Sequence, residues 1–166
     1  MKFQIKHRYS LAVLFEAEAG TLNEVVQKAV AQRIDLRGSD LSGSDLSGSD
    51  LTYSDLRGSN LRGSDLTSSD LRGSKLSGSD LYDVKIRDGI TVSRAPIQIN
   101  GLRWPVTIWD AHMQIGCKFY SHADWAAFDN ATIAAMDPDA AEFWQIFKSP
   151  LLALCKNHSD ICRREE

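Results

Sequence analysis

Large aliphatic residues recur at every fifth position through the middle of the chain. Leu occupies positions 36, 41, 46, 51, 56, 61, 66, 71, 76 and 81, and Ile86 continues the series. The position two before is Ser in nine consecutive cases, the position directly before is Asp in eight of eleven, and the position two after is Gly in seven. Residues 35–88 therefore repeat the pattern S-D-L-x-G.

A five-residue period fits neither ordinary element. On an α-helix successive Leu would be rotated by about 140°, and on a flat strand an odd period sends them to opposite faces. All of them reach one core only if the backbone turns once per pentad, which Gly at the corner permits. A fixed period over many units is typical of a solenoid. The alternative is a disordered Ser/Gly-rich linker, but a linker has no reason to keep eleven aliphatic residues in phase.

The repeated motif over residues 34–88 resembles the pentapeptide repeat family, whose pattern is A/S-D/N-L-x-x with the central Leu directed inward. The resemblance implies a right-handed quadrilateral β-helix with about four pentads per coil. It implies little about activity, because one fold supports many functions. We therefore expect a mainly β protein built on a short pentapeptide β-helix.

The residues before the repeat predict a cap for its open end. Residues 2–8 alternate between polar and apolar, residues 11–17 form a second apolar run, and together they predict a hairpin. Thr21 and Glu24 then match a capping box ahead of residues with helical spacing. Since a solenoid end would otherwise expose its core and strand edges, we expect residues 1–33 to cover it.

The repeat pattern decays after Ile86, and residues 90–166 predict a separate α+β segment, with the pentapeptide domain spanning 34–89. Asn100-Gly101 predicts a two-residue hairpin turn, and residues 113–119 alternate as one strand would. The C-terminal part predicts helices, with a break at Asp129-Asn130, a start at Asp137-Pro138 and a restart at Ser149-Pro150.

A softer resemblance concerns this C-terminal segment. Pentapeptide repeat proteins encoded by phages and prophages are similar in having a hairpin and helix before the repeats and a segment like Trp109–Cys117, followed by Trp-rich helices, after them. The resemblance implies a phage or prophage origin and no known activity for the C-terminal part.

Composition and charge limit the classes of partner and the compartment that we expect. The formal net charge of −3 is unfavourable for direct nucleic-acid binding, and no apolar run approaches the length of a membrane span. Three Cys do not make a disulfide framework, so we expect the cytoplasm of a bacterial host. No sequence motif indicates a cofactor.

The Asp positions are the first candidate site. With four pentads per coil, residues twenty apart stack, which places Asp45 on Asp65 and Asp50 on Asp70. The DNA-mimic face that we predict comprises Asp40, Asp45, Asp50, Asp55, Asp65 and Asp70. Its carboxylates would stand where a DNA-binding protein expects phosphates, as the resemblance to members that protect DNA gyrase from quinolones implies. The alternative is that outward Asp simply suits the repeat turn.

Other side chains support weaker hypotheses. Trp104, Trp109 and Trp125 are either core residues or an exposed interface for a target or a homodimer. Asp110, His112 and Cys117 could form a nucleophilic site. Neither the spacing of His112, Cys117 and His122 nor that of Cys155, His158 and Cys162 matches a paired zinc signature, so no metal is expected.

The sequence thus favours a non-enzymatic binding protein that occupies the DNA-binding surface of a host DNA-acting complex. The candidate complexes are a CRISPR or other defence nuclease, a restriction system and gyrase. A scaffolding module that binds a protein through its C-terminal aromatic residues is the alternative.

Overall fold

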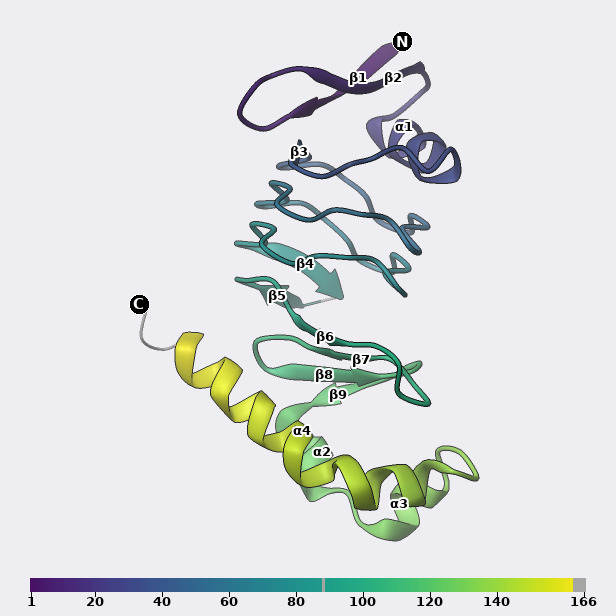
Figure 1. Ribbon diagram of the computed structural model, residues 1–166, viewed down its shortest axis with the longest axis vertical. Helices are drawn as coiled ribbons and strands as arrows, with labels where there is room; N and C mark the ends of the chain where they lie inside the picture. The colour runs from purple at the N-terminus through teal and green to yellow at the C-terminus, as the bar shows by residue number, and fades with distance from the viewer. Residues whose placement is uncertain (88, 163–166) are drawn as a thin grey trace. The chain divides into compact units, whose positions relative to one another are not determined.

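The computed structural model describes residues 1–87 and 89–162, with side chains to residue 160. These residues form two compact units that divide between Ala95 and Pro96 (Figure 1). The first holds β1 (Lys2–His7), β2 (Val13–Glu18), α1 (Leu22–Ala31), β3 (Ser39–Asp40), β4 (Val84–Arg87) and β5 (Ile90–Val92). The second holds β6 (Ile97–Ile99), β7 (Val106–Ile108), β8 (His112–Ile115), β9 (Lys118–Ser121), α2 (His122–Ala127), α3 (Asn130–Ala134) and α4 (Ala140–Cys162).

The repeat segment stacks upon itself with a spacing of twenty residues. Parallel bridges join Asp40 to Asn60 and Asn60 to Asp80, and equivalent bridges join four further pairs. Backbone hydrogen bonds follow the same spacing, as in Leu41 N–H to the carbonyl of Asn60 at 2.8 Å. Twenty residues are the length expected of four pentads per coil. The coils contribute isolated bridges, however, and the longer strands of this unit belong to antiparallel sheets.

Each pentad turns its chain at the same place. The amide of Ser44 donates to the carbonyl of Leu41 at 3.2 Å, and Gly43 between them has a φ of +63°. These features define a type II turn, which requires a positive φ at its third residue and explains why Gly recurs there. Most of the repeated Leu are buried: Leu36, Leu41, Leu46, Leu51, Leu56, Leu61, Leu66, Leu76 and Leu81.

The inward Ser residues are the polar part of this core. Ser49, for example, is 1% exposed, and its hydroxyl donates to the carbonyl of Leu46 at 2.6 Å. Ser54 and Ser59 make the same bond to the residue three positions earlier. Because a buried hydroxyl without a partner is costly, this local bond stabilises the polar residue at these inward positions. The hydroxyls of Ser39 and Ser64, in contrast, are buried without a hydrogen-bond partner among the described residues.

The N-terminal segment covers the first coil. β1 pairs antiparallel with β3, and Ile5 of β1 is fully buried together with Val25, Val26 and Ala29 of α1. The Arg8 side chain reaches further along the stack, where its Nη1 donates to the carbonyl of Gly58 at 3.2 Å.

The capping of α1 differs in one bond from the predicted box. The Thr21 hydroxyl accepts the amide of Glu24, but the Glu24 carboxylate accepts the amide of Gly20 instead of that of Thr21.

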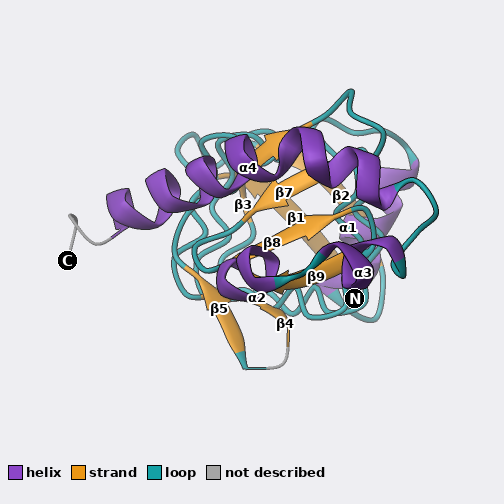
Figure 2. Ribbon diagram, turned by 90° about the horizontal axis from the view of Figure 1, so that it is seen from below, coloured by secondary structure: helices purple, strands orange, loops and turns teal. Residues whose placement is uncertain are grey.

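The second unit is a four-stranded antiparallel sheet in the order β6-β7-β8-β9, with helices packed on it (Figure 2). Two predictions were wrong here. β6 and β7 are joined by residues 100–105 rather than by Asn100-Gly101 alone. Residues 113–119 are two strands, because Gly116-Cys117 forms the two-residue turn with a φ of +57° at Gly116, which suits the first position of a type II′ turn. The turn puts Phe119 opposite Gln114, on the other face from Met113.

The helices confirm the break at Asp129, which caps α3, and correct the restart at Pro150. α4 continues through Pro150, although this residue has no N–H to donate to the carbonyl of Ile146. Ile146 is 60% exposed, so water can satisfy its carbonyl, while Leu151 and Cys155 continue the buried face. None of the described helices is long and apolar enough to cross a membrane.

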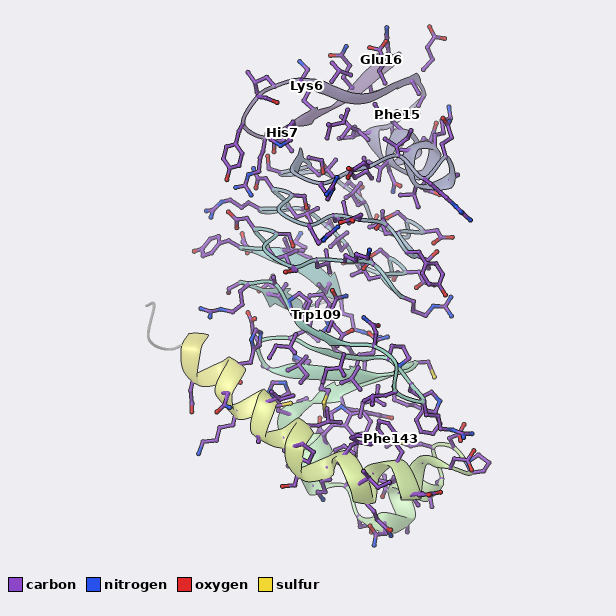
Figure 3. The ribbon with its side chains drawn as sticks, viewed as in Figure 1. Lys6, His7, Phe15, Glu16, Trp109 and Phe143 are labelled. Atoms are coloured by element: carbon purple, nitrogen blue, oxygen red, sulfur yellow. The ribbon has the colours of Figure 1, made fainter. Side chains whose placement is uncertain are left out.

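The core of the second unit is aromatic. Trp125 and Trp144 are buried with their ring centroids 5.2 Å apart. Phe143 of α4, which is labelled in Figure 3, has its ring centroid 5.2 Å from that of Trp104 in an edge-to-face contact. The Trp125 indole N–H donates to the carbonyl of Met113 at 2.7 Å, which fixes α2 on the sheet.

Replacement of one inward Leu tests the repeat core. We expect Leu61→Ala to lower the free energy of unfolding by about 2–5 kcal/mol, because it leaves a cavity between stacked coils. Chemical denaturation followed by circular dichroism measures the change. Ser77→Ala, at an exposed position of the repeat, is the matched control and should change the free energy by less than about 0.5 kcal/mol. A loss for Leu61→Ala as small as that of the control would contradict the stacked core.

Candidate functional site

The outward Asp residues have a structural role in every coil. In nine pentads the side-chain oxygen of the Asp or Asn accepts the amide of the residue two positions later, as in Asp45 and Ser47 at 3.0 Å. This bond closes an Asx turn just before the type II turn. The alternative that outward Asp suits the repeat turn is therefore part of the answer. At Asp40, Asp45 and Asp50 the hydrogen bonds found among the described residues use one carboxylate oxygen and leave the second available.

The predicted stacks are present. Asp45 bridges Asp65 and Asp50 bridges Asp70, which gives two faces with paired carboxylates. Asp40 lies on a third face, where the Asn60 amide donates to its carboxylate at 3.0 Å. Of the six predicted residues, Asp55 lies on the fourth face, where it bridges Lys75.

Basic residues neutralise part of these faces. Arg72 pairs with Asp70 at 2.6 Å, Arg57 pairs with Asp55 at 2.6 Å, and Lys85 lies 3.9 Å from Asp65. Among the described side chains, no ion pair includes Asp40, Asp45 or Asp50. Among the six predicted residues, the uncompensated charge is thus confined to the first coil, where Asp40, Asp45 and Asp50 bear it.

Hydrogen bonds lower the pKa of two of these carboxylates, Asp45 and Asp50. The Ser47 hydroxyl, which donates to Asp45 at 2.6 Å, and the Ser47 amide lower the pKa of Asp45, although the neighbouring Asp65 acts in the opposite direction. The Thr52 hydroxyl and amide likewise lower the pKa of Asp50. Because every outward Asp can use a local donor, stacked carboxylates are tolerated at neutral pH.

Tyr53 is a feature that we missed in the sequence. It occupies the position of the turn where most pentads have Gly, has a φ of +56°, and is 83% exposed. It lines a groove between the end of α1 and the first coils together with Arg33, Arg37 and Arg57. In the sequence this feature is a bulky residue at a position where most pentads have Gly. A bulky residue is strained at a positive φ, and an exposed ring does not offset this strain by burial.

The three Trp residues predicted as an interface differ in how far their side chains are exposed. Trp109 and Trp125 are 3% and 2% exposed, so they are core residues rather than a contact surface. Trp104 is half-buried and lines an apolar pocket in the second unit, beside Cys117 and Trp144.

The candidate nucleophilic site does not form. His112 and Cys117 lie at opposite ends of the β8–β9 hairpin, where His112 is paired with Ser121 and the turn holds Cys117. The His112 ring instead stacks on Phe119 at 5.1 Å. No group of three or more potential metal ligands occurs among the described residues.

The third set of candidate ligands belongs to the core of α4. Cys155 is buried, which raises the pKa of its thiol to about 11, and His158 is buried with its Nε2 3.7 Å from Asp110. The Ser159 hydroxyl donates to the carbonyl of Asp110 at 2.9 Å and so ties α4 to the β7–β8 turn. The side chain of Cys162 lies outside the described residues.

Comparison with known families agrees with the stacked coils. A family model for pentapeptide repeats matches residues 32–67 and 49–88, with eight copies of the repeat. Residues 32–88 thus match the pentapeptide repeat family. The pentapeptide segment comprises 57 of the 166 residues and contains the whole predicted acidic face. The match indicates a protein-interaction module. A search of the curated proteins gave no match.

The lowered Asp pKa values predict acid sensitivity. Arg37 lowers the pKa of Asp35 from 3.8 to about 2, and hydrogen bonds lower that of Asp45 and Asp50. A carboxyl whose pKa is lower in the folded protein contributes stability above its unfolded value, and this stability is lost as pH falls through the folded value. In urea unfolding, the contribution of these carboxyls to the free energy should therefore be constant above about pH 5 and fall between about pH 4 and 2. Asp35→Asn should reduce the slope, and an unchanged slope would contradict the assignment.

The strained Tyr53 predicts a stabilising substitution. Tyr53→Gly should raise the free energy of unfolding by about 1 kcal/mol, because relief of the left-handed conformation exceeds the entropy cost of Gly. The reciprocal change, Gly63→Ala, places a side chain at the same turn position with a φ of +64° and open space around it. It should destabilise by about 1 kcal/mol. Thermal unfolding of both variants checks the pair, and a shift in the same direction would contradict the explanation.

Proposed function

We propose that this protein is a non-enzymatic inhibitor of phage or prophage origin. Its pentapeptide segment would be a short right-handed quadrilateral β-helix whose acidic first coil occupies the DNA-binding surface of a host DNA-acting complex. A CRISPR or other defence nuclease, a restriction system and gyrase are targets of the right chemistry, since each has a surface that attracts phosphates. All of them are in the cytoplasm of a bacterial host, where we propose that the protein acts.

The observation that carries this proposal is the set of three carboxylates on one coil that form no ion pair with any of the described side chains. Asp40, Asp45 and Asp50 lie on three successive faces, each is exposed, and each is held by an Asx hydrogen bond. A rigid backbone therefore presents the charges, so little side-chain freedom is lost when a partner binds them. Preorganisation of this kind favours electrostatic recognition of a basic surface.

The length of the repeat limits what it can imitate. Fewer than three coils span about 10–15 Å at the spacing of neighbouring strands. A duplex of about 15 Å carries roughly nine phosphate charges. Residues 35–88 contain ten acidic and seven basic residues, so they do not match a duplex over their whole surface. The proposal is therefore restricted to the first coil and to a short DNA segment.

A scaffolding module is the second candidate. It is favoured by the second unit, in which half-buried Trp104 and exposed Cys117 border an apolar pocket. In that case the second unit would bind a protein partner and the repeat would act as a spacer.

Neutralisation of the first coil separates the two candidates. Asn60 accepts the amide of Arg62 at 3.2 Å, as the Asp residues do in their own turns, so Asn can replace Asp without loss of the turn. The triple variant Asp40→Asn, Asp45→Asn and Asp50→Asn should therefore stay folded, with an unchanged circular dichroism spectrum at 25 °C. It should capture at least about tenfold less of the host proteins that the wild-type chain captures and that added duplex DNA releases.

A charge-matched control excludes a general effect of net charge. Glu18→Gln, Glu142→Gln and Asp124→Asn together change the net charge by the same amount at exposed positions on other elements. This control should retain the captured proteins. Capture that survives the triple Asn variant, or that duplex DNA does not displace, would contradict the proposal and favour the scaffolding module.

A further inference from the structure

A groove lies between the end of α1 and the first coils of the repeat (Figure 1). It is open to solvent and has a volume of about 710 Å³, which falls within the roughly 300–1,000 Å³ of small-molecule sites. Its lining brings three guanidinium groups, those of Arg33, Arg37 and Arg57, together with the ring of Tyr53. None of the three carboxylates that carry the proposed function lines it, so the groove is distinct from the acidic part of the first coil.

Two of these side chains stand where the backbone favours Gly. Arg33, with a φ of +55°, follows the C-cap of α1, and its amide donates to the carbonyl of Val30 at 2.9 Å. The next amide, that of Ile34, donates to the carbonyl of Ala29 at 2.9 Å, which completes a Schellman motif. The left-handed residue of this motif is usually Gly, and Tyr53, with a φ of +56°, likewise stands at the Gly position of its pentad.

The folded chain does not offset the conformational cost of these two residues. Both side chains are exposed, so neither recovers the cost by burial. Among the described residues five other than Gly have a positive φ, and the two others at this position of a pentad are Ser68 and Asp83, whose side chains are short. Strained residues gather at ligand sites, where the strain is retained for the group that it places. The convergence of Arg33 and Tyr53 on one groove therefore indicates a ligand that needs both a cation and an aromatic ring.

The repeat fixes the ring of Tyr53. Gly73 lies one coil further on, and a Cβ at Gly73 would lie 2.6 Å from Cδ1 of that ring. The ring therefore rests against the backbone of Gly73, where a side chain would displace it. Since Tyr53 is 83% exposed, most of the ring remains open to a flat aromatic group that stacks on it.

The lining of the groove is positive after its carboxylates are counted. Arg37 pairs with Asp35, so these two charges cancel. Arg57 pairs with Asp55 at 2.6 Å, and these two also cancel. The side chain of Arg33 takes part in no ion pair among the described residues, so its charge remains for a ligand.

Charges around the rim do not reverse this sign. Lys75 adds one positive charge beside Asp55. Arg72 and Asp70 form a pair at 2.6 Å, and Asp50 beside Arg72 adds one negative charge. The helix α1 ends here, but the Schellman bonds occupy two of its last carbonyls, so these do not oppose an anion. The groove therefore suits an anionic ligand.

The paired guanidinium groups keep donors for such a ligand. Arg37 donates to Asp35 through Nε and Nη2, and Arg57 uses the same two nitrogens in its own pair, so neither Nη1 donates to another described residue. The amide of Gly38 donates to the carbonyl of Arg57 at 3.0 Å, which puts the two Arg residues on successive coils, about 4.8 Å apart. Because the ion pairs hold both side chains, little freedom is lost on binding. A phosphate monoester suits this set better than a carboxylate, because it offers three acceptor oxygens to three guanidinium groups.

We propose that this groove binds a nucleoside monophosphate. The phosphate accepts from Arg33 and from the Nη1 groups of Arg37 and Arg57, and the base stacks on Tyr53. A free nucleotide fits better than a nucleic-acid strand, because the uncompensated carboxylates of the same coil repel a longer polyanion. The site goes beyond the proposed inhibitor function and does not depend on it, so the two can fail separately.

Nucleotide titrations test the groove on the purified full chain. We expect adenosine 5′-monophosphate (AMP) to shift amide resonances of ¹⁵N-labelled protein around Tyr53, with a Kd on the order of 0.1–1 mM. Ribose 5-phosphate, which has no base, and adenosine, which has no phosphate, should each bind at least about fivefold more weakly. No shift with AMP at about 10 mM, or an equal affinity for either fragment, would overturn the proposal.

Tyr53→Gly tests the contact with the base. Because this variant relieves the left-handed conformation, it should be at least as stable as the wild type, and a loss of binding cannot result from unfolding. It should weaken AMP at least about fivefold and leave the affinity for ribose 5-phosphate unchanged. Tyr82→Ser removes another exposed ring of the repeat and is the matched control. Wild-type affinity for AMP in Tyr53→Gly would refute the site.

Arg33→Gly tests the contact with the phosphate. It removes the unbalanced charge of the lining and places Gly at its preferred position in the Schellman motif, so the variant should fold. It should weaken AMP and ribose 5-phosphate alike, by about threefold to tenfold. Lys6→Gln changes the net charge by the same amount at an exposed position of β1 and should leave both affinities unchanged. Equal effects of the two variants would reduce the binding to a general effect of charge and contradict the groove.

A strand of nucleic acid distinguishes a free nucleotide from the end of a chain. A short 5′-phosphorylated oligonucleotide of deoxyadenosine should bind no more tightly than AMP, because the acidic faces of the coil repel its further phosphates. Tighter binding of the oligonucleotide would overturn the assignment to a free nucleotide in favour of single-stranded nucleic acid.

Discussion

The hydrogen bond from the amide of each inward Ser to the carbonyl of the preceding Leu determines the rest of the pentapeptide segment. It closes a type II turn once per pentad, and this turn is what returns every Leu to one core. The next coil then lies within reach of the backbone of the previous one, so Leu46 N–H can donate to the carbonyl of Asp65 at 2.8 Å. Without the turn, a five-residue period would place successive Leu on different sides, and the core could not form.

The same geometry explains why acid is abundant on the surface and why most of it is not free. The residue before each Leu must satisfy an amide two positions later, and a short side chain with an oxygen does so best. Asp is therefore selected by the turn before any partner is considered. Function can only appear in what the turn does not require, namely the ion pairs around Asp55, Asp65 and Asp70 and the lack of any ion pair to Asp40, Asp45 and Asp50 among the described side chains. The recognition surface is thus defined by two neighbours of each carboxylate. One is the residue after the Leu, where Arg57 and Arg72 neutralise Asp55 and Asp70, and the other is the residue one coil further on, where Lys85 lies near Asp65.

The sequence predicted the parts of the fold that repeat and failed where one local choice decides between two structures. Ten Leu residues at a constant spacing of five predict the stacking, whereas Asn100-Gly101 and Gly116-Cys117 both satisfy the composition of a two-residue turn. The register of the sheet chooses the second, because Ile115 then pairs with Lys118 and keeps Met113 in the core. The predicted helix restart at Pro150 was wrong for a similar reason. The helix continues through Pro150 and keeps its buried face, and it lacks only the hydrogen bond to the carbonyl of exposed Ile146.

The site could be predicted only as far as it depends on the period. The stacking of Asp45 on Asp65 follows from twenty residues per coil, so it was accessible from the sequence. The pocket in the second unit was not, because Trp104, Cys117 and Trp144 come from separate elements that no period relates. The indole Nε1 of Trp144 is buried without a hydrogen-bond partner among the described residues, but the same is true of Trp109, which does not line the pocket, so such a donor does not by itself indicate a ligand.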